Sequence, residues 1–192
     1  MTDWPARESA PASDDTSLVE AARGGDRGAY GRLYDRHARM IHGVLLARVP
    51  PGEVDDLVQD VFLQALPRLG SLRDAARFGA WLAAIARNRA NDFYRRSRPT
   101  TELTETLPTN QIEDRAATSA EMAQAAAILA AIRELPDAYR ETLILRLVEG
   151  MTGPEIAART GLTPGSVRVN LHRGMQQLRE KLGASSVKGS TL

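Results

Sequence analysis

The sequence predicts an all-α protein of two small helical domains joined by a flexible acidic linker, the second a helix-turn-helix domain. In both halves of the chain, apolar residues recur every three to four positions, and no segment shows the alternation of a strand. A segment rich in threonine and proline separates the two halves. The chain has 192 residues, 43% of them hydrophobic, which suits one ordinary domain or two small ones.

The charges fall into blocks of alternating sign, although the formal net charge is only +1. Residues 17–98 hold fourteen basic and nine acidic side chains, and residues 126–192 hold nine and six. Residues 1–16 and 99–125 are net acidic. The two basic blocks are therefore expected to meet nucleic acid or another polyanion. The predicted division is a disordered tail at 1–16, a domain at 17–98, a linker at 99–125, a domain at 126–183 and a flexible tail at 184–192.

The residue types exclude several kinds of chemistry. There are no cysteines, so disulfides, thiolate metal sites and a cysteine nucleophile are ruled out. The three histidines lie far apart in the sequence, and there is no glycine-rich phosphate loop. We therefore expect no enzyme activity, no cofactor and no bound metal. The longest nearly apolar stretch, Phe78 to Ala86, is too short to cross a bilayer, so the sequence predicts a cytoplasmic protein without membrane insertion.

Helix start signals divide the first basic block into four helices. Ser17 and Glu20 fit a capping box for the first helix, and Asp26 fits the cap of a long second helix. A proline pair at 50–51 ends that helix. The third helix is predicted at about 53–66.

The third helix has two contrasting faces. Its buried face is predicted to hold Val54, Leu57, Val58, Val61, Phe62, Ala65 and Leu66. Its opposite face holds Asp56, Gln59, Asp60 and Leu63. A leucine rimmed by carboxylates suits a docking surface, and a solvated acidic face is the alternative. A metal or acid–base role for Asp55, Asp56 and Asp60 is a weaker alternative, because no histidine lies nearby in the sequence.

A fourth helix is predicted from about Asp74 to Arg96. Its core stripe is Phe78, Trp81, Leu82, Ile85 and Phe93, and Arg89 and Asp92 are expected to pair on that side. Its opposite face holds Arg87, Asn91, Tyr94 and Arg98, with small Ala80 and Ala84 that let a backbone approach closely. Guanidinium groups for phosphate, a ring for stacking and an amide for base edges suit single-stranded nucleic acid. A solvated basic face remains equally open.

The second basic block ends in a helix-turn-helix. One helix is predicted at about 119–135, and the next begins at Pro136 with Leu143, Ile144, Leu147 and Val148 buried. Thr152 and Glu155 form a capping box, Gly161 makes the turn and Thr163 caps the last helix. Near its start this last helix is expected to expose Ser166, Arg168, Val169, His172 and Arg173, where a recognition helix meets the major groove.

Three segments together resemble the sigma factors of bacterial RNA polymerase, of the small extracytoplasmic-function (ECF) group. They are DDLVQDVFLQAL at 55–66, FGAWLAAIARNRANDFYRRSR at 78–98 and the helix-turn-helix at 152–182. They stand in the family's order around an acidic linker that is too short for the additional middle domain of larger sigma factors.

The resemblance implies roles for the first domain. The 55–66 helix is expected to dock on the clamp helices of the polymerase's largest subunit through Asp55, Asp56, Gln59, Asp60 and Leu63. The 78–98 helix is expected to melt and read the minus-ten promoter box, with a base captured by the loop at 68–77. The minus-ten DNA residues are then Arg87, Asn88, Asn91, Tyr94, Arg95 and Arg98.

The resemblance also implies partners for the rest of the chain. The last helix is expected to read the minus-thirty-five box through Ser166, Arg168, Val169, His172 and Arg173. Val169 stands where the family often has a small polar residue, so it can offer only apolar contact. The flap of the second-largest polymerase subunit and an anti-sigma factor are further expected partners. No small-molecule substrate is expected, and the linker is expected to thread the polymerase's RNA path.

Two other functions compete with a sigma factor. A free-standing helix-turn-helix regulator would bind duplex DNA without polymerase, but leaves the basic face of the 78–98 helix unexplained. A nucleic-acid enzyme would use Asp55, Asp56 and Asp60 with a divalent metal, and no other feature of the sequence supports it.

Overall fold

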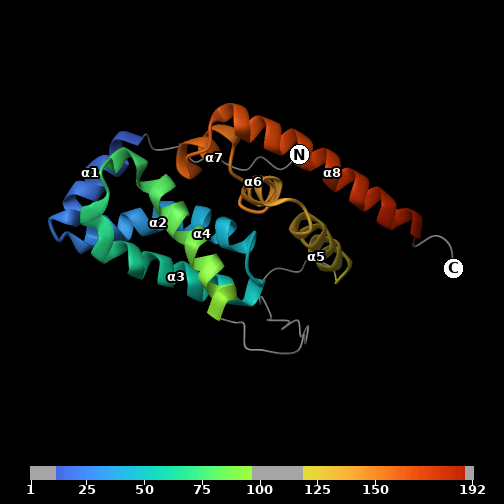
Figure 1. Ribbon diagram of the computed structural model, residues 1–192, viewed down its shortest axis with the longest axis horizontal. Coiled ribbons are helices and arrows are strands. Elements are labelled where there is room, and N and C mark those ends of the chain that lie inside the picture. The colour runs from blue at the N-terminus through green and yellow to red at the C-terminus, as the bar shows by residue number, and fades with distance from the viewer. Residues whose placement is uncertain (1–11, 97–118, 189–192) are drawn as a thin grey trace.

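The computed structural model describes residues 12–96 and 119–188, and within that part of the chain the protein is all-α, as predicted (Figure 1). Most of the predicted linker lies outside the described residues. The helices are α1 (Ala12–Arg23), α2 (Arg27–Leu46), α3 (Val54–Ala65), α4 (Phe78–Arg96), α5 (Ser119–Arg133), α6 (Asp137–Leu147), α7 (Gly153–Thr160) and α8 (Pro164–Lys188). Short 3-10 turns lie at Pro51–Glu53, Leu66–Ser71 and Ala75–Arg77.

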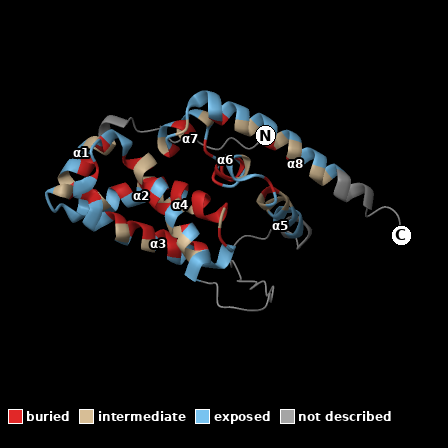
Figure 2. Ribbon diagram, in the orientation of Figure 1, coloured by how far each residue is buried: buried red, intermediate tan, exposed pale blue. Residues whose placement is uncertain are grey.

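Helices α1 to α4 form the first domain around a shared apolar core. The Asp26 side chain accepts a hydrogen bond from the Ala29 amide at 3.0 Å, which confirms the predicted cap of α2. The predicted inner face of α3 is buried from Val54 to Ala65, and only Leu66, at the end of the helix, is exposed instead. In Figure 2 the buried faces of these helices point toward one another.

Two helix ends differ from the prediction. The first helix begins at Ala12, so Ser17 lies inside it and the predicted capping box is wrong. The extra turn carries Asp15, whose carboxylate pairs with Arg36 at 3.0 Å and lies 2.9 Å from His37 of α2. At the other end, α8 continues to Lys188 through the predicted tail, which contains no proline to stop it.

Helices α5 to α8 form the second domain. The capping box of Thr152 and Glu155 is present, and Gly161 makes the predicted turn with a φ of 78°. Gly174 has a packing role that the sequence did not reveal: a Cβ there would lie 3.0 Å from Leu143 and 3.2 Å from Tyr139. A side chain here would crowd α6, so the glycine favours the close approach of α8.

The apolar face of α6 differs from the prediction. Leu147 and Val148, predicted to be buried, are about half exposed, whereas Leu145 is fully buried. The reason is that α6 is covered on two sides. Leu143 and Ile144 belong to the core of the second domain, and Leu145 points at α2 of the first.

The two domains pack against each other, α2 and α4 lying beside α6 and α7 (Figure 1). Glycines allow the close approach. A Cβ at Gly43 of α2 would lie 2.7 Å from Leu145, and one at Gly79 of α4 would lie 2.9 Å from the Arg159 carbonyl oxygen. A Cβ at Gly161 would lie 3.0 Å from Ala80, so the backbone that approaches this small residue is the chain's own. We call this contact of the domains the closed arrangement.

Candidate nucleic-acid interface and docking surface

The outer face of α3 presents an apolar centre rimmed by polar groups. Leu63 is 68% exposed, the most exposed of the large hydrophobic residues that the structure describes. Asp55, Asp56 and Gln59 are exposed on the same helix. Because the opposite face of α3 is buried in the core, the helix is held rigidly with these side chains outward. The predicted docking residues therefore share one accessible surface.

Asp60 has an additional role inside the first domain. Its carboxylate accepts hydrogen bonds from Nε and Nη2 of Arg89 at 3.2 and 2.5 Å. The predicted pair of Arg89 with Asp92 is wrong, and Asp92 pairs with Arg95 at 3.0 Å. The helices α3 and α4 pack side by side, so the long Arg89 side chain reaches across to α3. Asp60 thus joins the two helices as well as bordering the outer face.

The basic face of α4 is only partly free in the closed arrangement. Asn88, Asn91 and Arg95 are exposed. Tyr94 is half exposed, and its hydroxyl donates to the Arg48 carbonyl oxygen at 3.0 Å. Arg87 is engaged by Glu141 of the second domain. Arg98, also predicted to contact DNA, lies outside the described residues.

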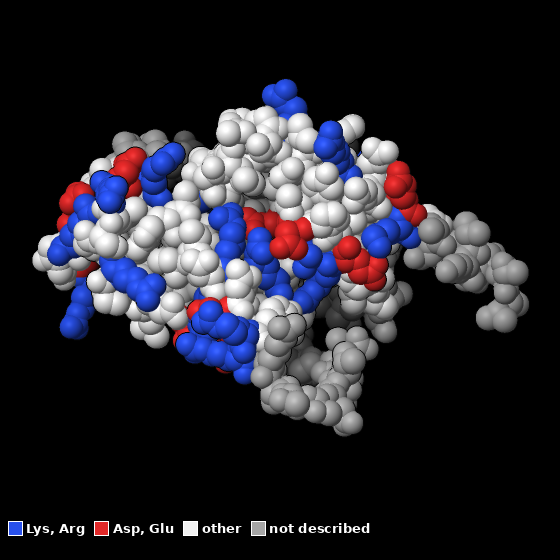
Figure 3. Space-filling view, in the orientation of Figure 1, with Lys and Arg blue, Asp and Glu red and all other residues white. Residues whose placement is uncertain are grey.

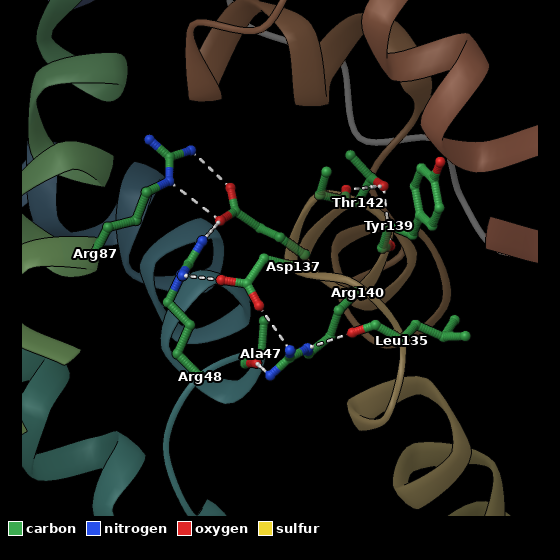
Figure 4. Close-up of polar contacts among 10 residues, drawn as sticks. Ala47, Arg48, Arg87, Leu135, Asp137, Tyr139, Arg140 and Thr142 are labelled. Carbon is green, nitrogen blue, oxygen red and sulfur yellow. Dashed lines mark hydrogen bonds and ion pairs between the residues drawn. The ribbon is translucent and has the colours of Figure 1, made fainter. Parts of the chain in front are cut away.

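One carboxylate of the second domain binds two arginines of the first. Glu141 of α6 is almost fully buried, and its oxygens accept from Nε and Nη2 of Arg87 at 3.1 and 2.6 Å. Nη2 of Arg48 donates to the same carboxylate at 2.9 Å, and its Nη1 donates to Asp137 at 3.1 Å. Figure 4 shows the side chains of Arg48 and Arg87 close together, and Asp137 reaching both Arg48 and Arg140.

A second carboxylate lies just after the end of α6. Glu149 is buried, and its oxygens lie 2.7 Å from Nδ1 of His42 and 3.4 Å from Nε of Arg39. The hydrogen bond to Glu149 raises the pKa of His42 above its ordinary 6.5, with a smaller opposing effect of burial. The charge of Asp55 adds to the increase. The charged histidine therefore favours the closed arrangement.

Arginines of the second domain also bind the carbonyl end of α2. Arg140 donates to the Ala47 carbonyl oxygen at 3.1 Å (Figure 4), and Arg133 donates to that of Val49 at 2.5 Å. These carbonyls follow the last turn of α2, where the helix dipole favours positive charge. In the space-filling view of the molecule, acidic atoms lie among basic ones near the middle of the face that is drawn (Figure 3).

The start of α8 is accessible, as predicted for a recognition helix. The residues exposed there are Ser166, Arg168, Val169, His172 and Arg173. The Ser166 amide donates to the Thr163 hydroxyl at 3.1 Å, so Thr163 caps the helix and holds its first turn in shape. A helix presented in this way can place arginine and histidine donors against base edges in a major groove.

Sequence reasoning missed Arg48, Glu141 and Glu149 as members of a site. The signal that could have found the two carboxylates is their spacing. Positions 141 and 149 lie four residues on either side of Leu145: Glu141 shares its side of α6, and Glu149 follows two residues after the helix ends at Leu147. Their partners lie up to 110 residues away in the sequence, and no local pattern connects them.

The part of the chain that the structure describes contains no group of three potential metal ligands. Its helices are also too short or too polar to cross a membrane. The described residues form two packed helical domains, with an exposed polar face on α3, arginines on α4 and an accessible start of α8 in a helix-turn-helix, which is the architecture of a two-domain helical DNA-binding protein.

Comparisons with known proteins identify the family. Residues 33–100 match the model of sigma-70 region 2, and residues 125–178 match that of sigma-70 region 4. The ECF sigma factor BldN of Streptomyces coelicolor is 35% identical over 90% of this chain and 69% of its own length. The sigma factor CarQ of Myxococcus xanthus is 33% identical over 86% of this chain and 95% of its own.

The chain belongs to the ECF sigma factors of RNA polymerase. The structure of CnrH in complex with the cytosolic domain of CnrY supports this, with a TM-score of 0.61 and 29% identity over 89% of this chain and 98% of CnrH. The protein is thus a transcription initiation factor that binds core polymerase and directs it to promoters. The region 2 match includes the basic face of α4 that a free-standing regulator left unexplained.

Proposed function

We propose that the outer face of α3 is the polymerase-docking surface, formed by Asp55, Asp56, Gln59, Asp60 and Leu63. The observation that carries the proposal is Leu63, whose side chain is 68% exposed on an otherwise well-buried helix. Burying a leucine removes apolar surface from water and contributes about 1.5–3 kcal/mol to an interface. The partner surface is that of the clamp helices of the largest subunit.

The DNA contacts are divided between the two domains. The minus-ten box is read and melted by Arg87, Asn88, Asn91, Tyr94 and Arg95 of α4, together with Arg98, which follows the helix in the sequence. The start of α8 reads the minus-thirty-five box in duplex DNA through Ser166, Arg168, Val169, His172 and Arg173. The support for this division is chemical: arginines beside an aromatic ring and amides suit a single strand, and a capped helix with exposed donors suits a major groove.

Two protein partners complete the proposal. The flap of the second-largest subunit contacts the second domain, and an anti-sigma factor holds the protein inactive in the cytoplasm. The solved relative CnrH is in complex with the cytosolic domain of CnrY, which supports a protein partner of this kind.

A pair of matched variants tests the docking surface. Leu63→Glu places a charge at the centre of the α3 face, and Val169→Glu does the same at an exposed apolar residue of α8. On gel filtration with core polymerase, wild type and Val169→Glu should co-elute stoichiometrically, whereas Leu63→Glu should bind at least about tenfold more weakly. Val169→Glu should instead impair promoter binding by the holoenzyme. Normal co-elution of a folded Leu63→Glu protein would refute the assignment of α3.

A further inference from the structure

The guanidinium groups of Arg48 and Arg87 form a pair that grips a single anion. Arg48 lies in the turn after α2 and Arg87 lies in α4, and together they donate three hydrogen bonds to the one carboxylate of Glu141, at 2.6, 2.9 and 3.1 Å. In the closed arrangement both side chains are largely buried, 18% and 27% exposed. Two arginine forks converging on one anion are typical of phosphate binding.

The anion and the arginines belong to different domains. Arg48 and Arg87 stay together when the first domain separates from the second, because α2 and α4 share the core of the first domain. Their two carboxylate partners, Glu141 and Asp137, leave with α6. Among the described residues, Nε of Arg48 is buried without a hydrogen-bond partner even in the closed arrangement. Once these carboxylates have left, the Arg48–Arg87 pair would hold two adjacent positive charges and a free donor.

We propose that the Arg48–Arg87 pair is a phosphodiester-binding site for single-stranded DNA, and that Glu141 occupies it in the closed arrangement. This inference rests on the proposed minus-ten function of α4 and extends it to Arg48, in the turn that follows α2. When a DNA strand lies on α4, a backbone phosphate takes the place of the Glu141 carboxylate.

The surroundings favour a nucleic-acid strand over free phosphate. Tyr94 lies beside the pair, with its hydroxyl bonded to the Arg48 carbonyl oxygen, and Asn91 is exposed on the same helix face as Arg87. A ring for stacking and an amide for base edges next to a phosphate site are what a single strand requires. A cavity of about 380 Å³, lined by both arginines and Glu141, leaves the site open to solvent at the domain boundary.

The consequence is competition between Glu141 and DNA. The same two guanidinium groups cannot bind both anions, so the closed arrangement blocks part of the minus-ten surface. Opening of the domains and binding of the strand are therefore coupled. A change that weakens the contact of Glu141 with the arginine pair must strengthen the apparent affinity of the pair for DNA.

The test uses the full chain and a fluorescein-labelled oligothymidylate of about twelve nucleotides, titrated by anisotropy at several salt concentrations. Opening is followed by energy transfer between dyes on cysteines introduced by Arg27→Cys on α2 and Gln176→Cys on α8, since the natural chain has no cysteine. Glu141→Gln, alone and with Glu149→Gln, is expected to lower the transfer efficiency and to tighten binding of the oligonucleotide about tenfold.

The decisive comparison is made in the Glu141→Gln background. There Arg48→Gln should weaken binding about tenfold and reduce the salt slope by about 0.7, the value for one phosphate contact to a single strand. Arg48→Lys, which keeps the charge and the fold but loses the fork, should give an intermediate affinity. The matched control Arg32→Gln, at an exposed arginine of α2 in the same domain, should change the affinity less than about twofold.

Three results would overturn the proposal. The first is an effect of Arg48→Gln no larger than that of Arg32→Gln. The second is a transfer efficiency that stays at the wild-type value when both glutamates are replaced. The third is opening by inorganic phosphate at matched ionic strength, which would make the free anion the ligand. Because no polymerase is present, failure here leaves the docking test untouched, and failure of docking leaves this test valid.

Discussion

Replacing Gly43 by alanine should open the two domains without damaging either. Gly43 is buried inside α2, and a Cβ there would lie 2.7 Å from Cδ2 of Leu145 and 2.8 Å from Cγ of Glu149, both in the second domain. The substitution therefore acts on the domain interface and on the helix itself, with opposite signs.

The two effects can be estimated separately. Alanine is favoured over glycine in a helix interior by about 1 kcal/mol, in the open and closed forms alike. In the closed form, carbon contacts of 2.7 and 2.8 Å must lengthen by roughly 0.7 Å or more to reach an ordinary separation. Overpacking of this kind costs about 1–3 kcal/mol, which shifts the equilibrium between closed and open forms about 5- to 150-fold toward open.

The assay combines energy transfer between the same two dye positions with thermal unfolding. Gly43→Ala should lower the transfer efficiency while the first domain unfolds at the same or a higher temperature. Gly31→Ala is the matched control, because Gly31 lies in the same helix with open space around its Cβ position. It should give the helix stabilisation alone, with unchanged transfer.

Unchanged transfer in Gly43→Ala would refute the reasoning, since it would mean that α6 can occupy its place with a methyl group in the way. A lower unfolding temperature for the first domain would refute it differently. That result would show that the glycine serves the core of its own domain rather than the approach of α6.

Three further predictions follow from individual contacts. The charged form of His42 should stabilise the closed arrangement, fully so below its ordinary pKa of 6.5. This contribution should disappear as the pH rises through the raised pKa of His42. The efficiency of energy transfer between the two dyes should fall in that pH window for wild type and not for His42→Gln. Gly174→Val should lower the free energy of unfolding of the second domain by about 1–3 kcal/mol in urea, because α8 could no longer pack on α6. Asp60→Asn should lower the free energy of unfolding of the first domain by about 1 kcal/mol or less, since Asp60 is 43% exposed. Asp60→Arg should lower it further, because the new arginine faces Arg89. Equal stability of the two variants would show that this ion pair has no structural role.

The helices and their exposed faces could be predicted from the sequence because both depend on local patterns. The cap at Asp26 and the capping box at Thr152 are encoded within three residues, and three-four spacing places the outer face of α3 and the start of α8 correctly. The partners of Arg89 and Arg87 could not be predicted in this way. They lie 29 and 54 residues away in the sequence, on helices whose relative placement is set by the packing of whole faces.

The same limit explains why the basic face of α4 admitted two readings. A count of charges shows an excess of arginine but not which anion neutralises it, and this chain holds a competing carboxylate of its own. Glu141 belongs to the same chain as Arg48 and Arg87, so it meets this pair at an effective concentration on the order of millimolar. A single weak phosphate contact would therefore not displace it. A strand that also stacks and bonds along α4 gains several contacts at once and can displace the carboxylate. A polymerase that held the two domains apart would remove the competitor, so we expect promoter DNA to engage Arg48 and Arg87 more tightly after docking.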